Sequence, residues 1–333
     1  MLALLLLLVA ASPPYQDPFR AGLIALQRGD LQAAQTNLEA ARTLAPRDGR
    51  VWVALSQTYW RLHRNDDAEA AASKAAALAP EDPAVLDSLV IYYSETSQTL
   101  KAAQAAAKYS SKAPEKSAAR ERAIDLYFQA TRPLLDQQKF GEAATILKEA
   151  VGRLPGSAQL ELALGVSYYG LRRFDEAADA FLRTIAIAPE IEQPYSFLGK
   201  ILDEIPNRLP QVTEKFAAYE AAHPTSAEGY LWHAKALNAQ SLPADESLRL
   251  LEKSMSLNGG DASAYFEMGT VLDRLQRFTD AVAAFEQAVK LAPGDPAGHY
   301  RLARDYDRIG KHEAAQAERE KHAQLVKAQE AIR

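Results

Sequence analysis

The stretch Trp52–Pro80, WVALSQTYWRLHRNDDAEAAASKAAALAP, decides the fold of this chain. Three large residues and one small residue lie in its first half at the i, i+3, i+4, i+7 spacing of one helix face, and they are Trp52, Leu55, Ser56 and Tyr59. Arg64-Asn65-Asp66 predicts a turn, and the alanine-rich segment after it predicts a second helix. Pro80 ends that helix because proline has no N–H and clashes with the preceding turn. The stretch therefore predicts two antiparallel helices joined by a short turn.

The same pattern returns along the chain at a fixed step. Pro46, Pro80 and Pro114 follow each other at 34 residues, and Ala34, Ala68 and Ala102 keep that step. It returns between Ala143 and Ala177 and between Pro155 and Pro189. A period of this length is typical of a helical repeat array. Such arrays are extended binding surfaces more often than they are catalytic centres.

The repeats resemble those of the tetratricopeptide repeat family. The resemblance is clearest in the eighth repeat, with Tyr265, Met268-Gly269, Leu272, Ala281, Phe285, Ala288 and Pro293. The fifth repeat shows it again, with Leu164-Gly165, Tyr168, Ala177, Phe181 and Pro189. It covers roughly residues 15–325 in about nine repeats. The resemblance implies an all-α fold, a right-handed superhelical solenoid of antiparallel helix pairs.

The phase of the repeats divides the chain into segments. We expect repeats 1 to 3 over residues 15–116, a helical insertion over 117–123, repeats 4 to 8 over 124–293, and repeat 9 with a polar capping helix over 294–333. The sixth repeat departs from the pattern because Pro206 and Pro210 fall between its expected helices. The second helix of the seventh repeat ends at Asn258-Gly259-Gly260 instead of at a proline.

The first residues, MLALLLLLVAAS, have a different character from the repeats. An apolar run is followed by small residues, which is the pattern of a secretory signal peptide, and we expect cleavage after Ala11. The run is too short to span a bilayer. The protein is therefore expected to be exported to the periplasm or the extracellular space, with contact to the membrane only through the cleaved leader. The alternative is an apolar first turn of the solenoid, since no lysine or arginine precedes the run.

Composition and motifs exclude several kinds of function. The chain has 333 residues, a net charge of -5 and no cysteine, so disulfides and thiolate metal sites are excluded. It has no basic run with interleaved aromatics, which argues against nucleic acid as a partner. No Gly-rich phosphate loop, HExxH pair or GxSxG motif is present, and the six histidines lack metal-ligand spacing. We therefore expect no enzyme activity, no cofactor and no metal.

In the tetratricopeptide repeat family the first helix of each repeat lines a concave groove that holds the ligand. Placing this chain in that phase predicts the partner-binding residues Trp60, Phe128, Arg132, Tyr169, Phe197, Lys200, Trp232, Lys235, Arg274, Arg301, Arg304 and Arg308. The middle of this set is aromatic and its end is basic, which would suit an extended peptide with acidic groups. The alternative is structural: the aromatics fill space between neighbouring first helices, and Arg304 and Arg308 pair with Asp305 or Asp307.

These observations favour a scaffold that binds partner proteins or peptides in a concave groove, in the cell envelope. A second hypothesis is a structural subunit that self-associates into a homo-oligomer or an envelope assembly. A third, weaker hypothesis is an enzyme that processes peptides or glycans in the groove, against which the absence of a catalytic motif argues.

Overall fold

The computed structural model describes residues 15–111 and 117–331, and every regular element among them is helical. The chain divides into two compact units, residues 1–167 and 168–333, each of which is described here by itself. The expected all-α fold of antiparallel helix pairs is confirmed in both. The boundary between the units falls inside α9 (Ala158–Gly170).

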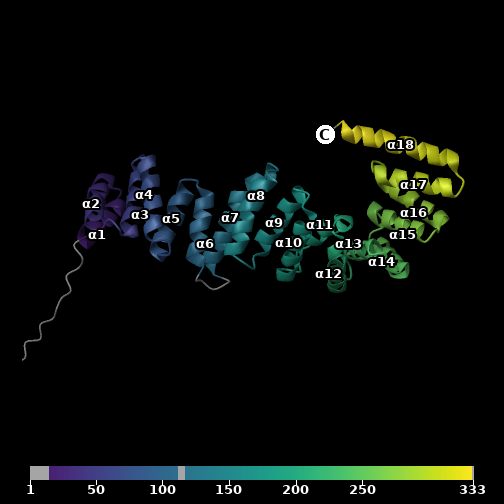
Figure 1. Cartoon of the computed structure of the whole chain (residues 1–333), viewed down its shortest axis with the longest axis horizontal. Coiled ribbons are helices and arrows are strands. Elements are labelled where there is room, and N and C mark those ends of the chain that lie inside the picture. The colour runs from purple at the N-terminus through teal and green to yellow at the C-terminus, as the bar shows by residue number, and fades with distance from the viewer. Residues whose placement is uncertain (1–14, 112–116, 332–333) are drawn as a thin grey trace, which may run out of the picture. The chain divides into compact units, whose positions relative to one another are not determined.

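The first unit contains four helix pairs ahead of α9. They are α1 (Gln16–Arg28) with α2 (Leu31–Leu44), α3 (Gly49–Arg61) with α4 (Asn65–Leu78), α5 (Pro83–Glu95) with α6 (Thr99–Ser110), and α7 (Ala118–Asp136) with α8 (Phe140–Arg153) (Figure 1). Within each pair the two helices pack on one another, and α3 also packs beside α5. First helices of successive repeats are therefore neighbours.

The second unit continues the same arrangement with one irregular repeat. Its elements are α10 (Phe174–Ile187), α11 (Gln193–Leu198), the 3₁₀ turns η1 (Leu202–Glu204) and η2 (Pro206–Arg208), α12 (Leu209–Ala222), α13 (Ala227–Ala239), α14 (Ala244–Leu257), α15 (Ala262–Arg274), α16 (Phe278–Leu291), α17 (Pro296–Arg308) and α18 (His312–Glu330). The terminal α18 buries only Ala315, because nothing among the described residues covers its outer face.

The turn after every first helix except α11 uses one residue in the left-handed backbone region. These residues are Gly29, His63, Ser97, Gln138, Arg172, Ser241, Gln276 and Gly310, with φ between 55° and 78°. In the second repeat the backbone N–H of Arg64 closes the turn by donating to the carbonyl of Tyr59 at 2.9 Å. This is the hydrogen bond of a Schellman helix end, and it reverses the chain within three residues. A recurring backbone conformation therefore sets the antiparallel pairing.

The positions of these left-handed residues also show where the array is irregular. The step is 34 residues over most of the chain but 41 residues from Ser97 to Gln138. That extra length belongs to α7, which begins at Ala118 and has 19 residues. Between Arg172 and Ser241 the step is 69 residues, so one such turn is absent from the sixth repeat among the described residues.

The sixth repeat is irregular because its first helix, α11, ends after six residues. The chain then forms η1 and η2 before α12 begins at Leu209. Our expectation that Pro206 and Pro210 both lie between the helices is half right. Pro206 begins η2, but Pro210 lies in the first turn of α12, where the missing N–H has no helical partner to lose.

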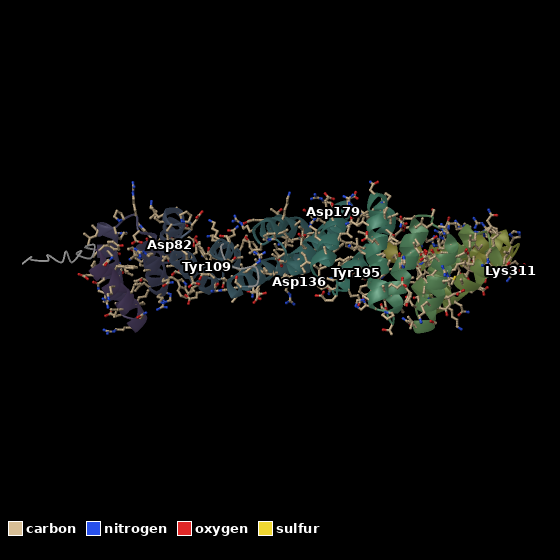
Figure 2. The ribbon with its side chains drawn as sticks, turned by 90° about the horizontal axis from the view of Figure 1, so that it is seen from below. Asp82, Tyr109, Asp136, Asp179, Tyr195 and Lys311 are labelled. Atoms are coloured by element: carbon tan, nitrogen blue, oxygen red, sulfur yellow. The ribbon has the colours of Figure 1, made fainter. Side chains whose placement is uncertain are left out.

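Aspartate caps begin several first helices. Asp48, Asp82, Asp261 and Asp295 each accept a hydrogen bond from a backbone N–H two residues further on, at 2.9–3.0 Å (Asp82 is labelled in Figure 2). Such a cap satisfies an N–H that has no partner inside the helix. These caps recur at the repeat step, so local hydrogen bonding and the hydrophobic pattern place the helix starts at the same residues.

Small residues let the two helices of a repeat approach closely. Gly269 in α15 faces Phe285 in α16, and a Cβ added at Gly269 would lie 2.7 Å from the phenyl ring. Gly22 and Leu38 repeat this arrangement between α1 and α2, where the added Cβ would lie 2.6 Å from the leucine side chain. Phe285 and Leu38 are both fully buried. In these two repeats the core is thus a large side chain packed on the backbone of the partner helix.

The expected leader, residues 1–11, lies outside the described residues. None of the helices that the structure describes is both long and apolar enough to cross a membrane.

We predict that Gly269→Ala destabilises the protein by about 1–3 kcal/mol, because the new methyl group overpacks a buried ring that has no space to move. The matched control is Gly152→Ala in α8, where an added Cβ meets no atom within 4 Å. This control should gain about 0.5–1 kcal/mol from helix propensity. Urea unfolding followed by circular dichroism measures both, and equal effects would contradict the proposed crossing.

Candidate functional site

Two adjoining cavities lie among the first helices of the second unit. The smaller has a volume of about 210 Å³ and the larger about 300 Å³. We call the two together the notch, and they share the lining residues Asp203, Lys235, Phe266 and Glu267. The smaller cavity is also lined by Gly199, Lys200, Leu202, Asn238, Ala239, Thr270 and Arg301. Its walls therefore come from α11 and η1, α13, α15 and α17.

The early end of α11 shapes one wall of the notch. Past Gly199 the chain turns into η1, where a regular first helix would have continued for about two more turns. The carbonyl of Gly199 then has no helical partner, and the Nζ of Lys235 on α13 donates to it at 2.9 Å. The side chains of Lys200 and Asp203 are exposed beside this bond. In the irregular repeat, a hydrogen bond from Lys235 on the next first helix thus replaces a hydrogen bond within the helix.

Glu267 is a buried carboxyl group in the lining of both cavities. It is 8% exposed, and the amide of Asn238 donates a hydrogen bond to its Oε1 at 2.6 Å. Burial raises the pKa of Glu267, whereas the Asn238 hydrogen bond and the charges of Lys235 and Arg301 act in the opposite direction. Our sequence analysis did not select Glu267, although a glutamate between Phe266 and Met268 in an apolar helix could have drawn attention to it.

The arginines expected at the basic end of the groove form an ion-pair network. Arg304 and Arg308 both bind the carboxylate of Asp273, and Arg301 lies 3.9 Å from it. Arg308 also pairs with the fully buried Asp305 at 3.0 Å. The expected pairing with Asp305 was thus only part of the arrangement, because the main partner is an aspartate on the neighbouring first helix. Much of the basic charge is compensated within the protein.

Other cations in the predicted set make weaker internal contacts. Arg274 donates to the backbone carbonyl of Leu242 at 3.1 Å. Lys200 is exposed, with its Nζ 5.5 Å from the centre of the Phe197 ring. Lys235 is half-buried and lines both cavities of the notch. Among the predicted cations of the second unit, Lys200, Lys235 and Arg301 therefore meet at one cavity, and the others lie outside its lining.

We expected Trp232 to be exposed in the groove, but it lies in the core. It is 7% exposed and packs against Tyr195, Phe216 and Tyr219, with ring centroids 5.5–6.2 Å apart. It also lies on Gly199, where an added Cβ would be 2.9 Å from the indole ring. Burial of the Tyr195 ring among these aromatics raises the pKa of its hydroxyl to about 12 (Tyr195 is labelled in Figure 2). The indole thus fills the space beside the shortened α11.

Tyr169 and Phe197 contact each other and remain half-buried. Their ring centroids are 5.1 Å apart in an edge-on arrangement, and Phe197 stacks on the buried Phe181 at 5.0 Å. These geometries are those of favourable aromatic pairs. Each ring is therefore packed on one side, as the structural alternative predicted. The part of each ring that is exposed remains available to a ligand.

Three predicted residues belong to the first unit. Trp60 is half-buried and lines a cavity of about 620 Å³ with Asp66, Glu69 and Glu95. Phe128 is half-buried. The Arg132 side chain is 71% exposed and lies 4.0 Å from Asp136. The structure does not bring these three residues together in one cavity.

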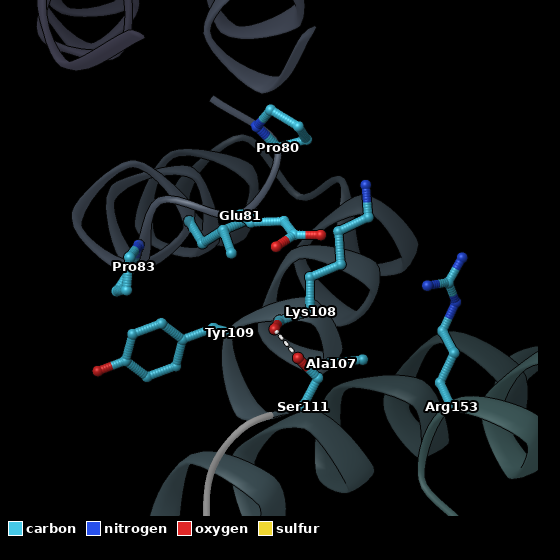
Figure 3. A pocket seen from close by; sticks show the side chains of 9 residues that line it. Pro80, Glu81, Pro83, Ala107, Lys108, Tyr109, Ser111 and Arg153 are labelled. Carbon is cyan, nitrogen blue, oxygen red and sulfur yellow. Dashed lines mark hydrogen bonds between the residues drawn. The ribbon is translucent and has the colours of Figure 1, made fainter. Parts of the chain in front are cut away.

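A further cavity of the first unit lies away from the predicted residues. Its volume is about 610 Å³, and its lining includes Pro83, Lys108, Tyr109 and Arg153. Figure 3 shows Tyr109 and Pro83 at one end and Arg153 at the other, with the Oγ of Ser111 donating to the Lys108 carbonyl at 2.8 Å. This cavity lies between the start of α5 and the end of α6.

Metal-binding groups were sought over residues 15–111 and 117–331. Within these ranges no three or more histidine, aspartate or glutamate side chains are placed to hold a metal ion.

Comparison with known proteins identifies the repeats. Family models described as tetratricopeptide repeat match residues 25–89, 132–190 and 262–295. No curated protein matches the chain significantly. Similar solved structures include MamA from Desulfovibrio magneticus RS-1, at 18% identity and a TM-score of 0.38 over 62% of this chain and 96% of that one.

Two further solved structures are similar over slightly more than half of the chain. The tetratricopeptide repeat protein TTC0263 from Thermus thermophilus is 23% identical, with a TM-score of 0.44 over 51% of this chain and 91% of that one. The pilF protein of Pseudomonas aeruginosa is 18% identical, with a TM-score of 0.46 over 60% and 90%. None of these likenesses supports a particular ligand or partner.

We predict that Trp232→Ala lowers the free energy of unfolding by about 3–5 kcal/mol, as expected for removal of a buried aromatic side chain. Trp60→Ala is the matched comparison and should cost less, because Trp60 is half-buried. Thermal unfolding measured by circular dichroism checks both variants. If the Trp232→Ala protein were as stable as the unaltered chain, the indole would not be part of the core.

A second prediction concerns pH and Glu267. Because its pKa is raised in the folded state, its stabilising contribution is complete below the pKa of an unfolded glutamate and is lost as the pH rises through the raised value. Glu267→Gln keeps an acceptor for Asn238 and removes this loss. The melting temperature of the variant, relative to the unaltered chain, should therefore increase between about pH 4 and pH 8.

The control for this measurement is Glu252→Gln, at an exposed position away from the first turn of α14. Its melting temperature should follow that of the unaltered chain at every pH. A difference for Glu267→Gln that stays constant with pH would show that the carboxyl group titrates as it does in the unfolded chain.

Proposed function

The chain is a tetratricopeptide repeat protein, and we propose that it holds an extended peptide segment of a partner protein along the first helices of its repeats. Its repeats make it a scaffold for protein interactions in general terms. The finer proposal concerns where the partner binds and how. It is carried by the smaller cavity of the notch, whose lining comes from four successive repeats.

The side chains at the notch suit a peptide chemically. Lys235 and Lys200 offer charged donors, Asp203 and Thr270 offer oxygen atoms, and Phe266 offers an apolar face. A peptide main chain needs donors and acceptors along its length together with apolar contacts for its side chains. Nearby, the exposed edges of Tyr169 and Phe197 extend the apolar area in the same unit. These groups require no rearrangement of the core.

We further propose that the protein works after export, in the periplasm or outside the cell, as the leader-like residues 1–11 indicate. The absence of cysteine is compatible with an oxidising compartment. A scaffold in that place would hold an envelope protein for assembly or for transfer.

To test the binding surface, we predict that Lys200→Glu lowers capture of a partner from envelope extracts, because it reverses a charge at the edge of the notch. The bait is the chain that lacks residues 1–11, and mass spectrometry identifies and quantifies the captured proteins. The amount of captured partner should fall about tenfold if the partner accepts a hydrogen bond from the Lys200 ammonium group.

The matched control is Lys253→Glu, which makes the same change at an exposed position of the second helix α14. This variant should capture the partner at the unaltered level. Equal capture by both variants would place the binding surface elsewhere. Light scattering of the bait alone distinguishes a monomer that binds a partner from a chain that binds only itself.

A further inference from the structure

The notch is the part of the second unit where the regular repeat is broken, and its charges are uneven. Lys200, Lys235 and Arg301 line the smaller cavity, against the acidic side chains of Asp203 and Glu267. Asp203 and Lys200 are both exposed to solvent, so their opposite charges are screened alike. Glu267 is buried, and its raised pKa lowers the share of the ionised form. The cavity therefore presents more cationic donors than anionic acceptors.

The donors at this cavity have capacity that the protein does not use. Lys235 directs one bond to the Gly199 carbonyl at 2.9 Å, and an ammonium group has three N–H donors. The Arg301 guanidinium lies 3.9 Å from the Asp273 carboxylate, which is a loose ion pair beyond hydrogen-bonding distance. Both residues therefore have donors for an anionic ligand, and the lysine is already held in place by α11.

We infer that the notch is a subsite for a glutamate or aspartate side chain of a bound peptide, with Lys235 and Arg301 as the donors to its carboxylate. This inference rests on the proposed function, because the peptide is the one held along the first helices. It adds the chemical class of the peptide and the residues that select it. Charge complementarity is the argument, since a cationic wall favours an acidic segment and opposes a basic one.

The shape of the notch favours a side chain over a chain terminus. The two cavities share four lining residues, Lys235 and Phe266 among them, so they lie next to each other. A peptide can therefore pass across the notch with one side chain pointing into the smaller cavity. That cavity, about 210 Å³, has room for one acidic side chain.

In this arrangement the negative charge that Glu267 retains opposes binding of an acidic group. Its Oε1 accepts from Asn238, which holds the carboxyl group against α13 beside Lys235. A neutral group of the same shape would keep that hydrogen bond while removing the remaining negative charge. Glu267→Gln should therefore strengthen binding of an acidic peptide, whereas a cation-binding notch would be weakened by the same change.

The test uses the chain without residues 1–11 and libraries of nonapeptides with blocked termini. The central residue is fixed as Glu, Gln or Lys, and the other positions are randomised. We expect capture in the order Glu, Gln, Lys. Lys235→Gln and Arg301→Gln should each lower capture of the Glu library by about tenfold and lower capture of the Gln library by clearly less. Two variants are used because Lys235 also bonds Gly199, and melting temperatures confirm that each variant folds.

The controls separate the possible failures. Lys253→Gln on α14 should not change capture of any library. Preference for the Lys library, or an unchanged Glu library with both variants, would overturn the acidic subsite while leaving peptide binding intact. A library with a free carboxyl terminus and a central Gln would overturn the side-chain assignment if it matched the Glu library. No capture of any library, the Gln library included, would contradict the proposed groove itself.

Discussion

The structure depends on the close crossing of the two helices in each repeat. Where Gly269 meets Phe285 there is no room for even one methyl group, and Gly22 meets Leu38 in the same way. A buried ring or leucine packed directly on a helix backbone gains dispersion contacts and loses solvent-exposed apolar area. The crossing fixes the distance and angle of the pair. The pairs then stack, because each has a second apolar face that its own partner cannot cover.

Such an array leaves the outward positions of the first helices open to variation. A change there costs little, since neither the crossing nor the turn after the helix depends on it. The chain nevertheless breaks its own pattern in the sixth repeat, where α11 stops after Leu198. Trp232 fills part of the vacated space and Lys235 bonds the exposed carbonyl of Gly199. The break is thus compensated by contacts from the next repeat, and the notch is the space that remains.

Much of the fold could be predicted from the sequence because it follows from spacing. The 34-residue step, the small residues opposite large ones and the prolines after second helices are local signals that repeat in phase. The candidate site was harder to predict from the sequence, because it depends on the orientation and the contacts of individual side chains. Trp232 has the spacing of a groove residue, yet it is buried because α11 is short. Pro206 and Pro210 indicated an irregular repeat, but they did not show how many residues of the helix would be missing. Arg301, Arg304 and Arg308 were predicted at the groove, but the aspartate that they share, Asp273, lies on the preceding first helix, and spacing within one helix does not show that relation.

The two charge clusters of the second unit differ in a way that bears on binding. Around Asp273 the charges of Arg304 and Arg308 are partly compensated by a carboxylate whose side chain is only 10% exposed, so a ligand would have to compete with a formed network. At the notch the acid is buried with a raised pKa, and the nearby lysine is held by a backbone carbonyl instead of a carboxylate. A carbonyl orients an ammonium group without cancelling its charge. An anionic ligand therefore has to break fewer ion pairs at the notch than at the arginine network. For this reason the arginine network is the weaker candidate for binding, although it contains more basic residues.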